Sequence, residues 1–351
     1  MDAIRLLTEL LQRFSPTGYE TDAVSFMIES MRQFGFQAHR DEAGNAVGTI
    51  GSGSREILLL GHIDTVPGKI AVRMENEILY GRGAVDAKGP LASFIFAGAQ
   101  ASLTSDWRIT VIGAVGEEGD SLGARHLCKT YPAPEMVVIG EPSGWESITL
   151  GYKGSFWSEA SIVQPSSHTA SGITSACDQI FRFWNQLTND IEELNAGKTR
   201  VFDRLSPSIR GMRSTSDGFE DNAILDINIR LPREVDLPLL EGLLSKAAEK
   251  AGNQPVFKTV DYMPAYQGEK NTTLVKSFLH AIRANGGAPG FKLKTGTSDM
   301  NLVGPVWNCP MIAYGAGDSN LDHTANEHIV LSEFLKGIQV LTTALERIQC
   351  L

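Results

Sequence analysis

Cysteine is scarce in this chain of 351 residues, and its four cysteines lie far apart, at Cys128, Cys177, Cys309 and Cys350. No two of them form a Cys-x-x-Cys pair, so the sequence lacks zinc-ribbon ligands and a disulfide framework. Long apolar runs are also missing, since none approaches the ~20 residues of a membrane span. Residues 1–14 alternate Leu and Ile with polar residues, unlike a signal peptide. We therefore expect a cytoplasmic protein without a membrane partner.

Positive charge is in deficit as well. The chain has 31 Lys and Arg against 41 Asp and Glu, a formal net charge of -10. An acidic chain is a poor ligand for polyanions, so no nucleic-acid partner is expected. Hydrophobic residues make up 42% of the chain, enough for a sizeable core. The length suits two domains of roughly 150 residues each.

Short apolar runs alternate with helical patterns along most of the chain. The runs 57–60, 109–115, 136–139 and 311–314 are typical of buried strands, and helical spacing occurs at 3–14, 20–34, 89–102 and 121–129. Alternating strands and helices predict an α/β fold with a mostly parallel sheet flanked by helices.

The middle of the chain has a different pattern. Residues 156–163 and 223–231 alternate as strands do, while residues 173–187 and 239–251 have helical spacing. We predict an inserted α+β domain at 152–261. It would interrupt a catalytic domain formed by 1–151 and 262–351.

Each predicted strand of the catalytic domain runs into acidic or histidine residues. The segments that follow are GHIDTVP (61–67), GEEG (116–119), GEP (140–142) and a loop ending in LDHT (321–324). Ligand sites of open α/β sheets lie outside the carboxyl ends of the strands. The residues expected to converge there are His62, Asp64, Glu117, Glu118, Glu141 and His323. Asp86, in the glycine-rich loop 81–89, is a further acid.

This set of residue types favours bound metal. Several neighbouring acids repel one another unless a cation is present. Two histidines with carboxylates and no nearby cysteine favour zinc, cobalt or manganese over calcium. An acid shared between two ions is typical of two-metal hydrolases. His62 and Asp64 point to the same side of an extended chain, so one could bind metal while the other orients it. Glu117 and Glu118 must point differently, one as a ligand and one as a general base.

In their order, these motifs resemble the cytosolic zinc metallopeptidases that include acetylornithine deacetylase, succinyl-diaminopimelate desuccinylase, aminoacylase and carboxypeptidase G. The resemblance covers nearly the whole chain and rests on SPTG (15–18), HxDTVP (62–67), GRGxxDxKG (81–89), GEEG, GEPS (140–143) and His323. It implies two divalent ions, zinc first and cobalt as the alternative. His62 and Glu141 would hold one ion, Glu118 and His323 the other, and Asp86 both. Glu117 would be the general base, and Asp64 would orient His62.

The resemblance also assigns roles to the inserted domain, as a lid through which two copies form a homodimer. His168 would reach the partner subunit's active site and stabilise the oxyanion. Arg230, accompanied by Asn222, would lie near the substrate carboxylate. The loop of Thr295, Gly296, Thr297 and Ser298 would contact the substrate.

Within the family, KTGTSDMN (294–301), YGAGDS (314–319) and the short GEEGD (116–120) resemble hydrolases that release lysine or ornithine from an amino-group carrier protein. A small acidic carrier protein is then the expected partner. The alternatives act on small N-acyl amino acids: acetylornithine or acetyl-lysine deacetylase, succinyl-diaminopimelate desuccinylase, or a general dipeptidase. A metal-binding scaffold without activity is disfavoured because both Asp64 and Glu117 are present.

Several residues also have simpler interpretations. Glu117 and Glu118 could merely open a helix, where acids favour the helix dipole. Asp86 could be an ordinary turn residue, and His168 and Arg230 could be surface residues. The run KTRVFDRLSPSIRGMR (198–213) holds five basic residues and one acid. It could be a solvated loop of the lid or a docking site for an acidic partner.

Overall fold

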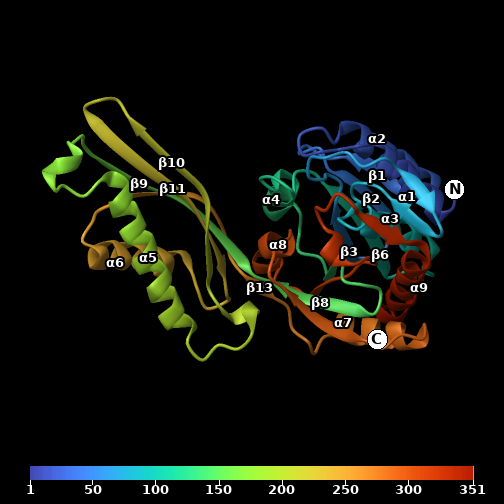
Figure 1. Ribbon diagram of the computed structural model, residues 1–351. Helices are drawn as coiled ribbons and strands as arrows, with labels where there is room; N and C mark the ends of the chain where they lie inside the picture. The colour runs from blue at the N-terminus through green and yellow to red at the C-terminus, as the bar shows by residue number, and fades with distance from the viewer. Residues whose placement is uncertain (351) are drawn as a thin grey trace. The chain divides into compact units, whose positions relative to one another are not determined.

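The computed structural model describes residues 1–350 and divides into two compact units (Figure 1). Unit 1 comprises Met1–Gly151, Gly268–Leu293 and the chain from Ser298 onward. Unit 2 comprises Tyr152–Gln267 and Lys294–Thr297. The segment predicted as the inserted domain, 152–261, lies within unit 2, which continues beyond it. Among the described residues, no helix has the length and apolar character needed to cross a membrane.

The main sheet of unit 1 carries parallel strands at its centre. Its order is β1 (Gln37–Arg40), β2 (Ala46–Gly51), β6 (Trp107–Ala114), β3 (Arg55–His62), β7 (Met136–Gly140), β15 (Met311–Ala313) and β8 (Ser147–Tyr152), with β14 (Gly290–Lys294) on β8. β3 pairs in parallel with β6 and β7, and β15 with β7, whereas β1, β2 and β8 pair antiparallel. The predicted mixed α/β fold with a mostly parallel sheet is confirmed.

Both faces of this sheet are buried, which is why its strands are continuous apolar runs. Ile57 and Leu59 belong to the main hydrophobic cluster, while Leu58 and Leu60 point the other way and are equally buried. The helices of unit 1 are α1 (Ala3–Gln12), α2 (Thr21–Gln33), α3 (Lys88–Gln100), α4 (Leu122–Thr130), α7 (Thr273–Ala284), α8 (Met300–Trp307) and α9 (Leu331–Ile348). A small sheet of β4 (Arg73–Glu75), β5 (Ile78–Tyr80) and β16 (His328–Val330), and the 3-10 turn η3 (Ser319–Leu321), complete the unit.

Unit 2 is an antiparallel sheet with two helices. The strand order is β10 (Ser206–Ser216), β11 (Glu220–Leu231), β9 (Gly154–Pro165) and β12 (Val256–Met263). Its helices are α5 (Ala176–Asn195) and α6 (Leu237–Ala251), and its shorter elements are η1 (Thr169–Ser171), η2 (Val201–Asp203) and β13 (Tyr266–Gln267). The strand and helix patterns predicted for this segment are confirmed, and β10 and β12 are additional strands.

The two helices of unit 2 cover one face of its sheet. Alternate residues of β11, such as Leu225 and Ile227, join a hydrophobic cluster with Phe183 of α5 and Leu240 of α6. The intervening residues of β11, from Asn222 to Arg230, therefore lie on the face that α5 and α6 leave open.

Candidate functional site

His62 is the last residue of β3, and its imidazole is almost completely buried. Its Nδ1 lies 3.0 Å from the backbone oxygen of Asp64 and 3.4 Å from the Oδ1 atom of that residue. Its Nε2 lies 3.1 Å from Asp86 Oδ1. Burial opposes protonation, but the hydrogen bonds with Asp64 and Asp86 raise the pKa of His62 well above its ordinary value. The Nδ1 atom of His62 is thus fixed by Asp64, while its Nε2 atom faces the carboxylate of Asp86.

Asp64 is fully buried and organises the turn that follows β6. Its Oδ1 accepts the backbone N–H of Glu117 at 3.1 Å, and its Oδ2 accepts that of Glu118 at 3.0 Å. The hydroxyl of Thr17 donates to the same Oδ2 at 2.7 Å. Burial would raise the pKa of Asp64, but hydrogen bonds from His62, Thr17 and Glu118 lower it. The Glu117–Glu118 pair lies in a turn and not in a helix, because α4 begins only at Leu122.

Asp86 joins the two histidines. It lies in the turn before α3, where Oδ1 contacts His62 Nε2 and Oδ2 lies 3.0 Å from His323 Nε2. His323 follows β15 in a loop, is half exposed, and also lies 3.1 Å from Glu118 Oε1. Hydrogen bonds to Asp86 and Glu118 raise the pKa of His323 to about 10. A single carboxylate therefore places one oxygen against each imidazole.

Within residues 1–350, three overlapping sets of side chains could hold metal, each with its ligand atoms within 4.8 Å of one another. The sets are His62 with Asp86 and Glu141, Asp86 with Glu118 and His323, and His62 with Glu117 and Glu118. The first two contain all five predicted ligands and share Asp86. Imidazole and carboxylate donors suit divalent zinc, cobalt or manganese. The donor set therefore fits two neighbouring divalent ions.

A buried ion pair that we had not predicted supports the Asp86 loop. Glu327, which is 1% exposed, accepts the Arg82 guanidinium on Oε2 at 2.8 Å. Its Oε1 accepts the backbone N–H groups of Val85 at 3.1 Å and Asp86 at 3.2 Å. The feature of the sequence that could have indicated Glu327 is its position four residues after His323, in the same loop.

Lys88 fixes the other end of that loop. Its ammonium group is buried and donates to the carbonyl oxygens of Leu10 at 3.2 Å and Arg13 at 2.6 Å, at the end of α1. Burial lowers the pKa of Lys88 to about 7. The lysine of the GRGxxDxKG motif thus connects the first helix to the Asp86 loop.

Asp299 is a second buried acid that the predicted site omitted, although it belongs to the quoted motif 294–301. It precedes α8, is 3% exposed, and its Oδ1 has no hydrogen-bond partner among the described residues. Burial raises the pKa of Asp299 to about 7. Burial first, and then the charges of Glu141, Asp299 and Glu118, raise the pKa of Glu117 against the influence of His62. Asp299, which belongs to none of the three metal sets, therefore helps to raise the pKa of Glu117 through its charge.

The remaining predicted residues lie mostly in unit 2. Arg230 is half-buried on β11, and its Nη1 lies 3.5 Å from the hydroxyl of Thr297, in the predicted loop 295–298. Asn222 lies at the other end of β11, opposite Val163. His168 precedes η1, is exposed, and its Nδ1 accepts the N–H of Ala170 at 3.1 Å. The structure thus brings Arg230 to Thr297 but places Asn222 and His168 elsewhere on unit 2.

Comparisons with known proteins identify the family of this chain. Residues 58–347 match the sequence profile of peptidase family M20/M25/M40. The chain belongs to this family. The resemblance inferred from the ordered motifs is thereby confirmed, and with it a place among peptidases, which hydrolyse amide bonds.

Two M20 relatives match over nearly their full lengths. The LysW-lysine hydrolase of Deinococcus radiodurans is 39% identical over 353 residues, which cover 99% of this chain and 97% of that protein. The LysW-lysine/LysW-ornithine hydrolase of Saccharolobus islandicus is 30% identical over 352 residues, which cover 99% and 96%.

A solved M20 structure shows the same fold. The YXEP protein of Bacillus subtilis, described as a dinuclear metal-binding peptidase, superposes with a TM-score of 0.73 at 13% identity. The match covers 98% of this chain and 96% of that one. At this identity the likeness concerns the fold alone.

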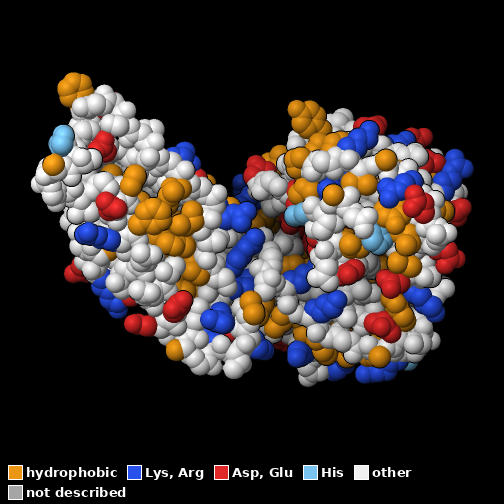
Figure 2. Space-filling model, in the orientation of Figure 1, with side chains coloured by type: hydrophobic (Ala, Val, Ile, Leu, Met, Phe, Trp, Pro, Cys, Tyr) orange, Lys and Arg blue, Asp and Glu red, His pale blue; other side chains and the backbone are white. Residues whose placement is uncertain are grey.

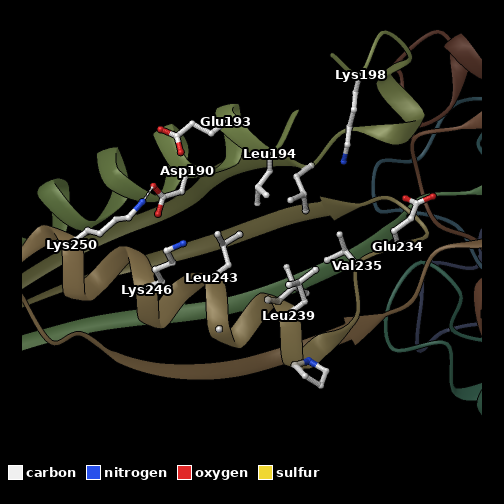
Figure 3. Close-up of a pocket in the computed structure, with 14 residues that line it drawn as sticks. Asp190, Glu193, Leu194, Lys198, Glu234, Val235, Leu239, Leu243, Lys246 and Lys250 are labelled. Atoms are coloured by element: carbon white, nitrogen blue, oxygen red, sulfur yellow. Dashed lines mark hydrogen bonds and ion pairs between the residues drawn. The ribbon is translucent and has the colours of Figure 1, made fainter. Parts of the chain in front are cut away.

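This M20 chain also has a large cavity in unit 2, between α5 and α6, with a volume of about 530 Å³ (Figure 3). Leu194, Leu239 and Leu243 line it, and Asp190 and Lys250 form an ion pair of 2.6 Å at one end. The fourteen residues that line it include no histidine or cysteine. Its lining therefore lacks the imidazole groups that His62 and His323 contribute to the unit 1 site.

Proposed function

We propose that this M20 chain is a metal-dependent amide hydrolase that releases lysine or ornithine from a LysW-type carrier protein in the cytoplasm. The observation that carries the proposal is the arrangement around Asp86, whose two oxygens lie 3.1 Å from His62 Nε2 and 3.0 Å from His323 Nε2. The names of the two relatives support the choice of substrate.

The residues fit a pair of divalent ions, with zinc proposed and cobalt as the alternative. His62 and Glu141 would hold one ion, Glu118 and His323 the other, and Asp86 would contribute to both. Two such ions, when bound, polarise a carbonyl group and lower the pKa of a water molecule. The protein's own contribution is the rigid placement of the donors by Asp64 and Glu327.

Glu117 is the proposed general base. Its backbone N–H is fixed by Asp64 at 3.1 Å, and its carboxylate belongs to the set that includes His62. In this position it can take the proton of the attacking water and return it to the leaving amine. The products are a carboxylate on the carrier and a free amino acid.

Unit 2 is the proposed lid, and a homodimer through this unit is part of the proposal. Arg230 would hold the substrate carboxylate, and Thr295, Gly296, Thr297 and Ser298 would line its position, whereas Asn222 lies at the other end of β11 from Arg230. The contact between Arg230 and Thr297 supports a joint role. The exposed imidazole of His168 is proposed to stabilise the oxyanion in the partner subunit's site.

A turnover panel tests the proposal. The substrates are carrier-linked lysine, carrier-linked ornithine, γ-glutamyl-lysine, acetyl-lysine, acetylornithine and succinyl-diaminopimelate, with a Glu117→Gln preparation as the blank. We expect the highest kcat/KM for a carrier-linked substrate. Preferred turnover of acetylornithine or succinyl-diaminopimelate would make the protein a deacetylase or desuccinylase, and metal binding without turnover of any substrate would make it a scaffold.

A further inference from the structure

The basic run 198–213 contains two kinds of cation. Arg200 is paired with Asp203 at 2.6 Å, and Arg213 is paired with Glu159 at 2.8 Å and with Asp226. These guanidinium groups are neutralised within unit 2. Arg204 and Arg210 are exposed, and neither has an acid partner among residues 1–350.

Arg210 owes its position to an irregularity of β10. Ile209 lies opposite Ile227 and Gly211 opposite Asp226, so Arg210 is the extra residue of a β-bulge. Bulges redirect a side chain relative to the regular strand. Burial lowers the pKa of Arg230, and the positive charge of Arg210 lowers it further. Arg210 lies on β10 four residues after Ser206, the cross-strand neighbour of Arg230, and its positive charge acts on Arg230.

Lys153 adds a third cation at the same place. Its side chain is buried just before β9, and its Nζ donates to the carbonyl oxygens of Val201, at 3.2 Å, and Arg204, and to Ser206 Oγ at 3.1 Å. Ser206 is the cross-strand neighbour of Arg230. Burial lowers the pKa of Lys153 to about 8; the charges of Arg230, Arg204 and Lys198 lower it further by smaller amounts, and the charge of Asp203 opposes them.

Such a gathering of like charges is costly unless an anion compensates it. It is also local, because the chain carries a net charge of -10, and acidic and basic side chains are interspersed over the visible face of unit 1 (Figure 2). Guanidinium groups bind carboxylates with paired hydrogen bonds. The chemistry of the cluster is therefore that of a carboxylate receptor.

We propose that Arg204, Arg210 and Arg230 form a cationic patch on unit 2, to which the buried ammonium of Lys153 adds only its charge, and that this patch binds an acidic peptide segment of the carrier protein. The inference rests on the proposed function and extends it, since one arginine suffices for the single carboxylate of a small substrate. Charge complementarity selects the occupant: the acidic chain as a whole disfavours nucleic acid, and the patch matches clustered carboxylates.

The test is the dissociation constant of unmodified LysW carrier protein, which is not itself hydrolysed. It is measured for the wild-type enzyme and for Arg210→Gln, Arg204→Gln and Arg182→Gln, at low and high salt. Arg182 is an exposed arginine of α5 and serves as the matched control. We expect Kd to rise about tenfold for Arg210→Gln, less for Arg204→Gln, and not at all for Arg182→Gln. The salt dependence of Kd should weaken in the first two variants.

The outcomes separate the patch from the proposed function. An unchanged Kd in both patch variants, with wild-type thermal stability, overturns the patch, as does an equal loss in the Arg182 variant. A change in self-association without a change in carrier binding assigns the cluster to a second copy and also overturns it. Tight carrier binding that depends on Arg210, with no hydrolysis of carrier-linked lysine, supports the patch and refutes the proposed function.

Discussion

Glu327 lies 3.2 Å from the backbone nitrogen of Asp86 and thereby fixes a residue whose side chain touches both His62 and His323. The same carboxylate neutralises the buried Arg82. The geometry around Asp86 thus depends on an acid that is not a predicted ligand.

Replacing Glu327 with Ala should therefore damage both stability and the site. It leaves a buried guanidinium and two backbone N–H groups without their acceptor, which we expect to cost about 3 to 5 kcal/mol in the free energy of unfolding. Glu327→Gln keeps one acceptor oxygen and should cost less. Urea unfolding gives the free energies, and zinc titration of the folded variants gives the metal affinity. Full stability and affinity in the Ala variant would contradict the supporting role.

Replacing Glu117 with Gln should abolish turnover while leaving metal in place. The substitution preserves shape and the backbone hydrogen bond to Asp64 but removes the proton acceptor, so kcat should fall by about 100- to 10,000-fold. Elemental analysis of the purified variant measures the bound metal. Asp120→Asn, in the same turn, is the control and should retain activity. Turnover within tenfold of wild type in the Glu117 variant would refute its assignment as the base.

Chelation should abolish activity, and zinc or cobalt should restore it. Because Asp86 contacts both histidines, Asp86→Ala should reduce the affinity for both ions, whereas His323→Ala should affect mainly one. The measurement is metal stoichiometry by calorimetric titration. His280→Ala, an exposed histidine of α7, is the control and should bind metal normally. Equal losses for Asp86→Ala and His323→Ala would argue against a shared ligand.

The ends of the central strands could be predicted because a buried parallel strand is a short apolar run that stops abruptly at polar residues. The structure places His62, Glu118 and His323 together after such runs, as the pattern indicated. The support of the site could not be predicted in this way. Glu327 acts on Val85, which is 242 residues away along the chain, and no local pattern marks such a pair.

β10 escaped prediction for a related reason. It contains Pro207, Gly211 and a bulge at Arg210, and most of its residues are half-buried or exposed. Neither an apolar run nor a clean alternation marks it in the sequence. The division of the basic run into paired and unpaired cations depends on cross-strand partners, such as Asp226 for Arg213, and is therefore visible only in the fold.

The buried Lys153 makes a prediction for the pH dependence of stability. Its pKa is about 8 in the folded protein, against 10.5 for the free side chain. Between these values the unfolded chain binds more protons, so this group makes the folded state more stable as the pH rises. Below pH 8 the free-energy cost of burying the charged ammonium is fully present, and above about pH 10.5 it has disappeared. The free energy of unfolding changes by roughly 3 kcal/mol over this range.

Lys153→Met should therefore flatten the rise in the free energy of unfolding between pH 8 and pH 10. The substitution also removes hydrogen bonds to Val201 and Ser206, but that loss shifts the whole curve and leaves its slope unchanged. Denaturant unfolding of wild type and variant at matched pH values measures the slope. Lys246→Met, on α6, is the control because that lysine side chain is exposed and its removal leaves no buried ammonium unpaired. Parallel curves for wild type and the Lys153 variant would show that the buried ammonium does not lose its proton in this range.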